Sequence, residues 1–480
     1  MSKIRILLLT NRDSDNVGDQ IIEATAISIL KAIMKNLGVP PQGFEISSRA
    51  AGIISKKYMK TRDPALLEPA RKAIAAADVV VFGGAPLFNY TYQSFYLRTI
   101  KTLELAQEYG VPVLFSSIGV EPYDATNRKS QALKKALASS GVRQITTRDD
   151  LASVQQYVEG TDIAVAHVSD PAVLADIVFR KKAKTATHVA ATAQRVSARV
   201  RRRIKRLGRQ VLGQKRQGAP TAPARPSAAV AAGATVDAPR AKRVGLVVTR
   251  AGIFADNGIA FSEEDQTKLW LDVIALLSER GYDYKLFTTG HYADEVFLDT
   301  LVRAHGIPLN KAAITVNSPE ELIGELSACA GVIAYRLHAS ITSFAYSVPS
   351  IGLSWNFKVP YFYESVGHGD RALGPERWNA TEVVDALERA MAEGVHKDKA
   401  FLWTVYETLF SGLKGILAPT TDRAPFTLEQ LRTELPPYPG TSQAQYREKV
   451  QSKFRRTYEA FQKYRLRDAA TQMEKQKTAV

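Results

Sequence analysis

The residues GVIAYRLHASITSFAYSVPSIGLSW, numbers 331–355, contain two apolar runs separated by a stretch with helical periodicity. The first run, GVIAY (331–335), and the second, SIGLSW (350–355), have the length and composition of buried strands. A strand, a helix and another strand in this order form the repeating unit of a parallel sheet with helices on both faces. This stretch therefore predicts an α/β fold.

The same alternation occurs in two long series. Strands are expected at 3–9, 78–84, 111–119, 143–148 and 162–168, and then at 243–250, 284–290, 312–316, 331–335 and 350–355. Helical periodicity lies between them, at 18–37, 65–77, 93–109, 129–139, 149–158, 262–280, 292–305 and 319–328. We predict two Rossmann-like domains in tandem, with a cleft between them.

Length and composition divide the chain further. A chain of 480 residues is too long for one hydrophobic core. We expect an N-terminal Rossmann-like domain over 1–179 and a basic amphipathic helix with an Ala/Pro-rich linker over 180–242. A C-terminal Rossmann-like domain over 243–420 and a charged helical tail over 421–480 follow.

The net charge of +16 belongs to one segment. Fourteen Lys and Arg residues and no acid lie between Arg180 and Arg216, which accounts for all but two of the net charges. Three interpretations are open: a nucleic-acid arm, a helix on a membrane surface, or a solvated insertion. No aromatic residue is present for base stacking, so we expect no nucleic-acid partner. A cationic helix with an apolar stripe favours peripheral contact with an anionic membrane.

The remaining composition indicates the compartment. The only cysteine, Cys329, excludes an internal disulfide framework and a cysteine zinc cluster. No apolar run approaches the roughly 18 residues needed to cross a bilayer. We therefore expect a cytoplasmic protein. A contact of the basic segment with the inner membrane face is a hypothesis that stands beside the solvated insertion.

Two polar residues follow the strand 331–335. If the backbone is still extended there, Arg336 and His338 project to the same side, beside the free N–H groups of the next helix. Such a corner suits an anion. The alternative is structural: Arg336 pairs with an acid of the other domain, and His338 caps the helix.

RLHASITSFAYSVPSIGLSWNFKVPYF (336–362) resembles the signature of the polysaccharide pyruvyl transferase family, in which Arg-x-His at a strand end precedes a small-residue helix, a Val-Pro-x-Ile/Val strand and a lysine. Further segments resemble the family in the same order: NVGDQ (16–20), FGGAPLFN (82–89), SSIGV (116–120), TRDDLASVQQY (147–157) and SDPAVL (169–174). The resemblance implies a glycosyltransferase-B-like arrangement. It also implies transfer of pyruvate from phosphoenolpyruvate to a saccharide as a ketal, in exopolysaccharide or cell-surface glycan synthesis.

The implied donor carries a carboxylate and a phosphate, which arginine binds through paired N–H groups. We expect Arg336 and Arg148 to bind it from opposite walls, although Arg148 could instead pair locally with Asp149 or Asp150. His338 is the expected general acid, because imidazole exchanges a proton near neutral pH. We expect Arg336→Ala to abolish turnover with little change in melting temperature.

Other candidates for substrate binding lie at strand ends. Asn16, Gly18 and Asp19 open a helix and could contact donor or acceptor, or form a plain turn. Gly83 and Gly84 follow a buried strand and could simply serve the turn. Lys358 could reach a donor oxygen, although a lysine on a loop is usually solvated.

The common nucleotide and zinc motifs are absent, and the other histidines lack metal-ligand spacing. We therefore expect neither a metal nor a cofactor. The resemblance implies phosphoenolpyruvate as the donor substrate and a saccharide acceptor, which is often lipid-linked in this family. One rival hypothesis is a nucleotide-sugar glycosyltransferase of the same two-domain fold, which would need an acid such as Glu364 to bind the donor ribose. A second rival is a non-catalytic surface protein whose basic helix is its function.

Overall fold

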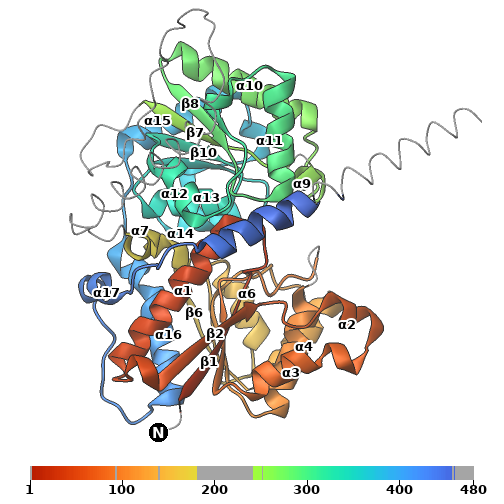
Figure 1. The fold of residues 1–480 in the computed structure, drawn as a ribbon, viewed down its shortest axis with the longest axis vertical. Coiled ribbons are helices and arrows are strands. Elements are labelled where there is room, and N and C mark those ends of the chain that lie inside the picture. Colours follow the sequence, from red (N-terminus) through yellow and green to blue (C-terminus); the bar gives the residue numbers. More distant parts are fainter. Residues whose placement is uncertain are drawn as a thin grey trace, which may run out of the picture. The chain divides into compact units, whose positions relative to one another are not determined.

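The computed structural model describes residues 3–91, 95–138, 141–180, 242–250, 252–456 and 459. By their contacts, residues 1–179 and 240–480 form one compact unit. It contains two six-stranded sheets covered by helices (Figure 1). The predicted α/β class with two Rossmann-like sheets is therefore confirmed.

The first sheet has the strand order β2-β1-β3-β4-β5-β6, and all neighbouring strands are parallel. Its chain order reverses between β1 and β3, which is the position where open α/β sheets bind ligands. The strands are β1 (Ile4–Thr10), β2 (Phe44–Ala50), β3 (Val79–Gly83), β4 (Val113–Ile118), β5 (Val142–Thr147) and β6 (Ala164–His167). The helices are α1 (Val17–Asn36), α2 (Lys56–Thr61), α3 (Glu68–Ala75), α4 (Phe95–Glu108), α5 (Arg128–Ala138), α6 (Leu151–Val158) and α7 (Ala175–Val178), with the 3₁₀ turn η3 (Pro171–Leu174) before α7.

The second sheet has the order β12-β11-β10-β7-β8-β9 and is again parallel. Its chain order reverses between β7 and β10. The strands are β7 (Arg243–Val247), β8 (Asp283–Phe287), β9 (Ala312–Ala313), β10 (Gly331–Ala334), β11 (Ser350–Leu353) and β12 (Ala372–Leu373). The helices are α9 (Gly252–Ala255), α10 (Glu263–Glu279), α11 (Tyr292–Ala304), α12 (Pro319–Ser327), α13 (Leu337–Ala345), α14 (Lys358–Ser365) and α15 (Ala380–Glu393).

After α15 the chain returns to the first sheet. Helix α16 (Lys399–Leu417) packs against β4 and β5, although its residues fall in the range predicted for the C-terminal domain. Gln144 Nε2 of β5 donates a hydrogen bond to the Thr408 carbonyl of α16 (3.0 Å). A short helix, α17 (Leu428–Glu434), and a C-terminal helix over residues 443–456 follow.

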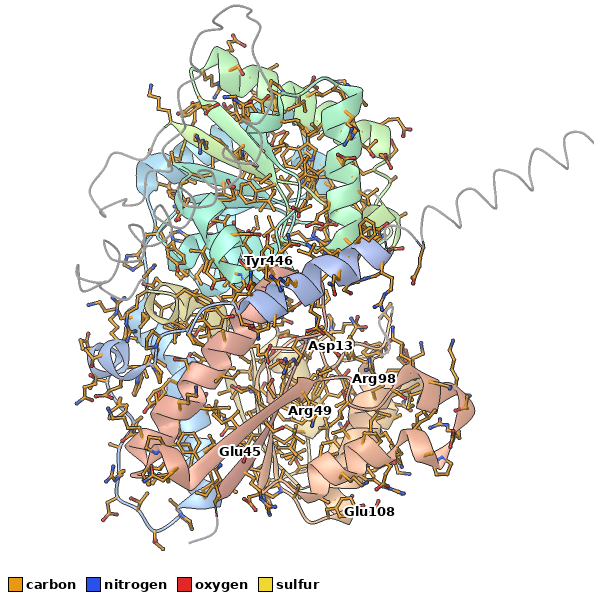
Figure 2. The ribbon with its side chains drawn as sticks, viewed as in Figure 1. Asp13, Glu45, Arg49, Arg98, Glu108 and Tyr446 are labelled. Atoms are coloured by element: carbon orange, nitrogen blue, oxygen red, sulfur yellow. The ribbon has the colours of Figure 1, made fainter. Side chains whose placement is uncertain are left out.

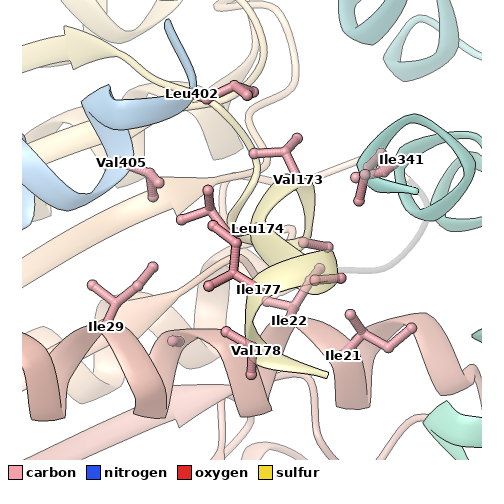
Figure 3. Close-up of a cluster of buried hydrophobic side chains, with 14 of the residues drawn as sticks. Ile21, Ile22, Ile29, Val173, Leu174, Ile177, Val178, Ile341, Leu402 and Val405 are labelled. Atoms are coloured by element: carbon pink, nitrogen blue, oxygen red, sulfur yellow. The ribbon is translucent and has the colours of Figure 1, made fainter. Parts of the chain in front are cut away.

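One hydrophobic cluster joins the elements that carry the candidate site. It contains Ile21 and Ile22 of α1, Val173 of η3, Ile341 of α13 and Leu402 of α16, all buried (Figure 3). Burial of such side chains contributes roughly 1.5–3 kcal/mol each. The cluster therefore holds the N-terminal ends of α1 and α13 near η3, although they are far apart in sequence.

The structure differs from the sequence prediction at a few elements. Strand β2 is missing from the prediction because it lies at the sheet edge, where its half-exposed residues form no continuous apolar run. Lys358, expected on a loop, is the first residue of α14. The basic segment and linker, apart from Arg180 and Lys242, lie outside the described residues. Within the described part of the chain, no helix combines the length and the hydrophobicity that a membrane span requires.

Candidate active site

The candidate residues lie at the carboxyl ends of the central strands of both sheets. Asn16, Gly18 and Asp19 follow β1, and Arg148 follows β5 directly. Arg336 and His338 follow β10. This strand ends at Ala334, so the extended backbone predicted to continue through His338 does not reach it. Arg336 is the N-cap residue of α13, with an extended backbone, and His338 is already helical. Both chain reversals thus contribute residues to one site.

His338 contacts the beginning of α1 directly. Its Nδ1 lies 3.0 Å from the Nδ2 of Asn16, and the Oδ1 of Asn16 accepts the N–H of Gly18 (3.0 Å), which caps the helix. Since the Asn16 amide nitrogen is a donor, this contact assigns Nδ1 as the acceptor and places the ring proton on Nε2. Asn16 and His338 belong to two motifs that lie far apart in the sequence, and the structure brings them into contact.

Gly18 is required by the histidine. A Cβ atom at this position would lie 2.2 Å from Cβ and 2.4 Å from Cγ of His338. No side chain can occupy this space, so the glycine permits the ring to pack on the first turn of α1. The close approach explains the Asn-x-Gly-Asp pattern better than a plain turn does.

The environment of His338 disfavours its charged form. Burial lowers the pKa of the imidazole to about 3, and the positive charges of Arg148, Lys358 and Arg336 add to this effect, while Asp170 opposes it. The ring is thus neutral at physiological pH. Its Nε2, 3.9 Å from Asp19 Oδ1, is buried without a hydrogen-bond partner among the described residues.

Arg336 is held by a buried carboxylate. Its Nε and Nη2 donate to the two oxygens of Asp294, each at 2.7 Å, and the Asp294 side chain is fully buried. The pair uses two of the five N–H donors of the guanidinium, which leaves three outside the fork. The structural alternative is thus partly right: Arg336 pairs with an acid, but on α11 beside the same sheet. His338 does not cap the helix.

Arg148 is also buried and paired. Its Nη1 donates to Asp170 Oδ2, while Asp170 Oδ1 caps η3 through the N–H of Ala172 (2.8 Å). Burial opposes the positive charge, but Asp170 and Asp149 outweigh it and raise the pKa of the arginine. Its Nε is buried and lacks a partner among the described residues. The alternative of a local ion pair with Asp149 or Asp150 is wrong in its partner, because the carboxylate that Arg148 pairs with belongs to Asp170.

Asp19 and Lys358 complete the group. Asp19 is buried, accepts Asn11 Nδ2 (3.1 Å), and has a pKa raised by burial. Burial lowers the pKa of the Lys358 amine, whereas the carboxylates of Asp149, Glu121 and Asp19 oppose that effect and Arg148 adds to it. Lys358 therefore lies among the same charges as His338, and is not a solvated loop lysine.

Gly83 and Gly84 have a packing role in the structure. A Cβ at Gly84, where φ is +63°, would lie 2.4 Å from Ile22 Cγ2 of α1. At Gly83 the nearest atom is Leu8 Cδ1, at 3.2 Å. Gly84 therefore allows α1 to pack over the end of β3, whereas the close neighbour of Gly83 belongs to β1.

Two further residues of the site escape the sequence analysis. Asp294 holds Arg336, and His291 Nδ1 lies 3.7 Å from Asp294 Oδ1. Burial and Arg336 lower the pKa of His291. Their position in the sequence could have identified them, because both lie at the beginning of α11, in the segment that follows strand β8. Among the described residues, no group of three His, Cys, Asp or Glu side chains could hold a metal ion.

The arrangement combines three cations, a neutral histidine and unpaired buried N–H groups. Such a set can bind a small multivalent anion through charge-assisted hydrogen bonds. A histidine beside that anion can hold or transfer a proton.

Comparison with known proteins agrees with this fold. A putative UDP-N-acetylglucosamine 2-epimerase from Listeria monocytogenes has a TM-score of 0.50 at 12% identity, over 89% of this chain and 100% of that chain. The UDP-GlcNAc 2-epimerase from Methanocaldococcus jannaschii, in complex with UDP-GlcNAc and UDP, has a TM-score of 0.48 at 13% identity, over 86% of this chain and 99% of that chain. A UDP-glucosyltransferase from Polygonum tinctorium has a TM-score of 0.41 at 11% identity, over 90% and 98%.

At such low identity the likeness shows a shared glycosyltransferase-B-like fold and nothing of the reaction. No curated protein matches the chain. A model of the family described as polysaccharide pyruvyl transferase, however, matches residues 16–356, which include the candidate residues at both chain reversals. The chain therefore belongs to the polysaccharide pyruvyl transferase family, whose members are transferases.

Proposed function

We propose that the protein transfers pyruvate from phosphoenolpyruvate to a saccharide and forms a cyclic ketal. The observation that carries this proposal is the grouping of Arg148, Arg336 and Lys358 around His338. Phosphoenolpyruvate brings a carboxylate and a phosphate on three carbons. Both groups can accept charge-assisted hydrogen bonds from the N–H groups of Arg148 and Arg336 that lie outside their carboxylate pairs, and from Lys358.

In the proposed reaction, the methylene carbon of the donor takes up a proton, and positive character develops on the carbon that carries the phosphate. A sugar hydroxyl attacks this carbon and phosphate leaves with the electrons of the C–O bond. A second hydroxyl then closes the ring. The two hydroxyl groups release two protons and the methylene carbon takes up one. The overall reaction therefore releases one proton.

His338 is the proposed general acid. Its pKa of about 3 keeps the ring neutral among the surrounding cations. A bound trianion offsets the charges of Arg148, Lys358 and Arg336, and so favours the protonated ring. Donor binding thus raises the pKa of the ring, in the direction that a general acid requires. A positioned acid accelerates such a step by about 10²–10⁴.

The decisive experiment measures phosphate release from phosphoenolpyruvate with a panel of oligosaccharides, beside release of nucleoside diphosphate from sugar nucleotides. We expect phosphate release that depends on the acceptor. Release of nucleoside diphosphate would instead favour a glycosyltransferase, for which Glu364 is a poor ribose ligand because it is exposed on α14. No release with either donor would leave the non-catalytic hypothesis.

Matched histidine variants test the role of His338. His338→Gln should lose at least a hundredfold in turnover, whereas His305→Gln should match the wild type because His305 is exposed at the end of α11. Equal turnover in both variants would remove His338 from the mechanism.

The lipid-linked acceptor and the membrane contact through 180–216 are further parts of this proposal. The basic charge of that segment supports weak binding to anionic vesicles that decreases with salt. Deleting 180–240 and repeating vesicle flotation at low salt tests it, and unchanged binding would exclude this contact.

A further inference from the structure

The C-terminal helix, residues 443–456, places four polar side chains on one face. Tyr446, Lys449, Lys453 and Arg456 are three or four residues apart, so they share a side of the helix. Figure 2 labels Tyr446 on this helix, and its hydroxyl donates to Glu321 Oε1 at 2.8 Å. The helix lies beyond the region matched by the family model, which ends at residue 356.

Two of these side chains hold the loop before α1. Lys449 Nζ donates to the carbonyl oxygens of Ser14 (3.0 Å) and Asp15 (2.8 Å). Both Nη atoms of Arg456 donate to the Asp15 carboxylate, which is buried. Asp15 directly precedes Asn16, the residue in contact with His338. The helix thus fixes the backbone from which Asn16 reaches the imidazole.

Lys453 holds the other half of the site. Its Nζ donates to Glu295 Oε1 (2.6 Å) and to the Val316 carbonyl (2.7 Å). Lys453 and Glu295 are 6% and 7% exposed, which is rare for a lysine and a glutamate. Glu295 directly follows Asp294, whose carboxylate holds Arg336. One helix therefore binds the immediate neighbours of both Asn16 and Asp294.

The other cations of this helix behave differently. Arg447 and Arg455 are exposed, as expected for a charged surface helix. The cations that reach acids and carbonyls next to the site all lie on the inner face. Ion pairs between exposed groups contribute little to stability. Any effect of the helix on the site therefore depends on the side chains of this inner face.

We propose that Lys449, Lys453 and Arg456 are positioning residues, through which the C-terminal helix keeps Asn16 against His338 and keeps the Asp294 fork on Arg336. The kinetic consequence rests on the proposed function, whereas the effect on the histidine does not. Displacing a reacting group by about 1 Å can cost roughly a hundredfold in rate. A helix outside the family signature would thus determine how well the geometry of the site is held.

The first experiment follows the His338 ring by NMR in the full chain labelled with ¹⁵N-histidine, with His338→Gln to assign its signals. Arg456→Gln should shift the His338 ring signals, Arg456→Lys should restore them in part, and Arg455→Gln should leave them unchanged. Lys449→Met removes the bonds to the two loop carbonyls and should give the same shift. Melting temperatures within a few degrees of wild type show that the fold is retained.

The second experiment measures turnover with phosphoenolpyruvate. We expect kcat/KM to fall between about tenfold and a hundredfold in Arg456→Gln, to recover in Arg456→Lys, and to stay unchanged in Arg455→Gln. If Arg456→Gln and Lys449→Met match Arg455→Gln in both experiments, the positioning role is wrong. If the wild type shows no turnover with this donor, the proposed function fails, and the NMR shifts alone decide the positioning role.

Discussion

Gly18 and His338 are in such close contact that a methyl group on one would overlap the other: a Cβ at Gly18 would lie 2.2 Å from the His338 Cβ. These residues are 320 positions apart and lie in helices α1 and α13, which follow strands of different sheets. The first turn of α1 therefore packs directly against the His338 side chain. This contact also predicts which substitution disturbs the site without removing any polar group.

Gly18→Ala should displace α1 or α13 locally, because the overlap is with the Cβ of the histidine and not with a flexible end. Overpacking of this kind costs about 1–3 kcal/mol of unfolding free energy. We expect this loss in urea unfolding, together with at least a tenfold loss of turnover.

Gly324→Ala is the matched control. Gly324 lies inside α12, and a methyl group added there would meet no described atom within 4 Å apart from the neighbouring backbone of its own helix. Alanine should therefore stabilise the helix by about 0.5–1 kcal/mol. If Gly18→Ala were as stable and active as Gly324→Ala, the contact between Gly18 and His338 would not exist in solution.

The Asp294 fork changes the expectation for Arg336. Removing the guanidinium leaves the fully buried Asp294 carboxylate without its ionic partner. The backbone N–H of Arg250 still donates to this carboxylate (2.9 Å). Breaking a buried pair costs about 3–5 kcal/mol. Arg336→Ala should therefore lower the melting temperature clearly, in addition to abolishing turnover, and not leave it almost unchanged.

Arg250→Ala provides the comparison for stability. The Arg250 guanidinium pairs with Asp256 at the surface, where both side chains are at least a third exposed. Its removal should change the unfolding free energy by less than about 1 kcal/mol. A similar melting temperature for both variants would show that Asp294 does not depend on Arg336.

The sequence alone predicts the parts of this site that depend on local pattern. Apolar runs locate most strands, and polar residues at strand ends identify Arg148, Arg336 and His338. Edge strand β2 is not predictable in this way because its residues are half exposed. The cap role of Asn16 is missing from the sequence prediction, although it depends only on the residues that follow it.

Ion-pair partners that lie far apart in the sequence could not be predicted from local pattern. Nothing in the residues around Arg336 indicates that Asp294 is its acid, and Asp170 read alone suggests only a loop before a proline. These pairs form because the hydrophobic cluster of α1, η3, α13 and α16 brings distant strand ends together. The contacts of the C-terminal helix are equally hidden, since its composition indicates only a charged tail.

The neutral state of His338 predicts a dependence of stability on pH. Its pKa is about 3 in the folded protein and about 6.5 in an unfolded chain. Below pH 6.5 the unfolded state therefore takes up a proton that the folded state refuses until about pH 3. The unfolding free energy is unaffected by this group above pH 6.5 and falls as the pH is lowered through that window.

Urea unfolding at pH 7.5 and 5.5 measures this effect. The wild type should lose about 1 kcal/mol more than His338→Gln over this interval. His305→Gln changes an exposed histidine at the opposite end of α11 from Asp294, and is the matched control. Equal losses in the wild type and His338→Gln would mean that the imidazole is not held neutral.

Lys358 separates binding from stability. Its amine is charged in a site where burial lowers its pKa, so Lys358→Met should leave the melting temperature unchanged or raise it. The same variant loses a cation facing the donor, and a charged hydrogen bond contributes about 1.5–3 kcal/mol. We therefore expect KM for phosphoenolpyruvate to rise about tenfold to a hundredfold.

Lys397→Met should show the opposite result. Burial also lowers the pKa of Lys397, but its Nζ donates to the Ala345 carbonyl at the end of α13 (2.6 Å), far along the helix from His338. Losing that bond should lower the melting temperature and leave KM unchanged, because no donor charge is involved. An unchanged KM in Lys358→Met would remove this lysine from the anion site, and leave the two arginines as its only proposed cations.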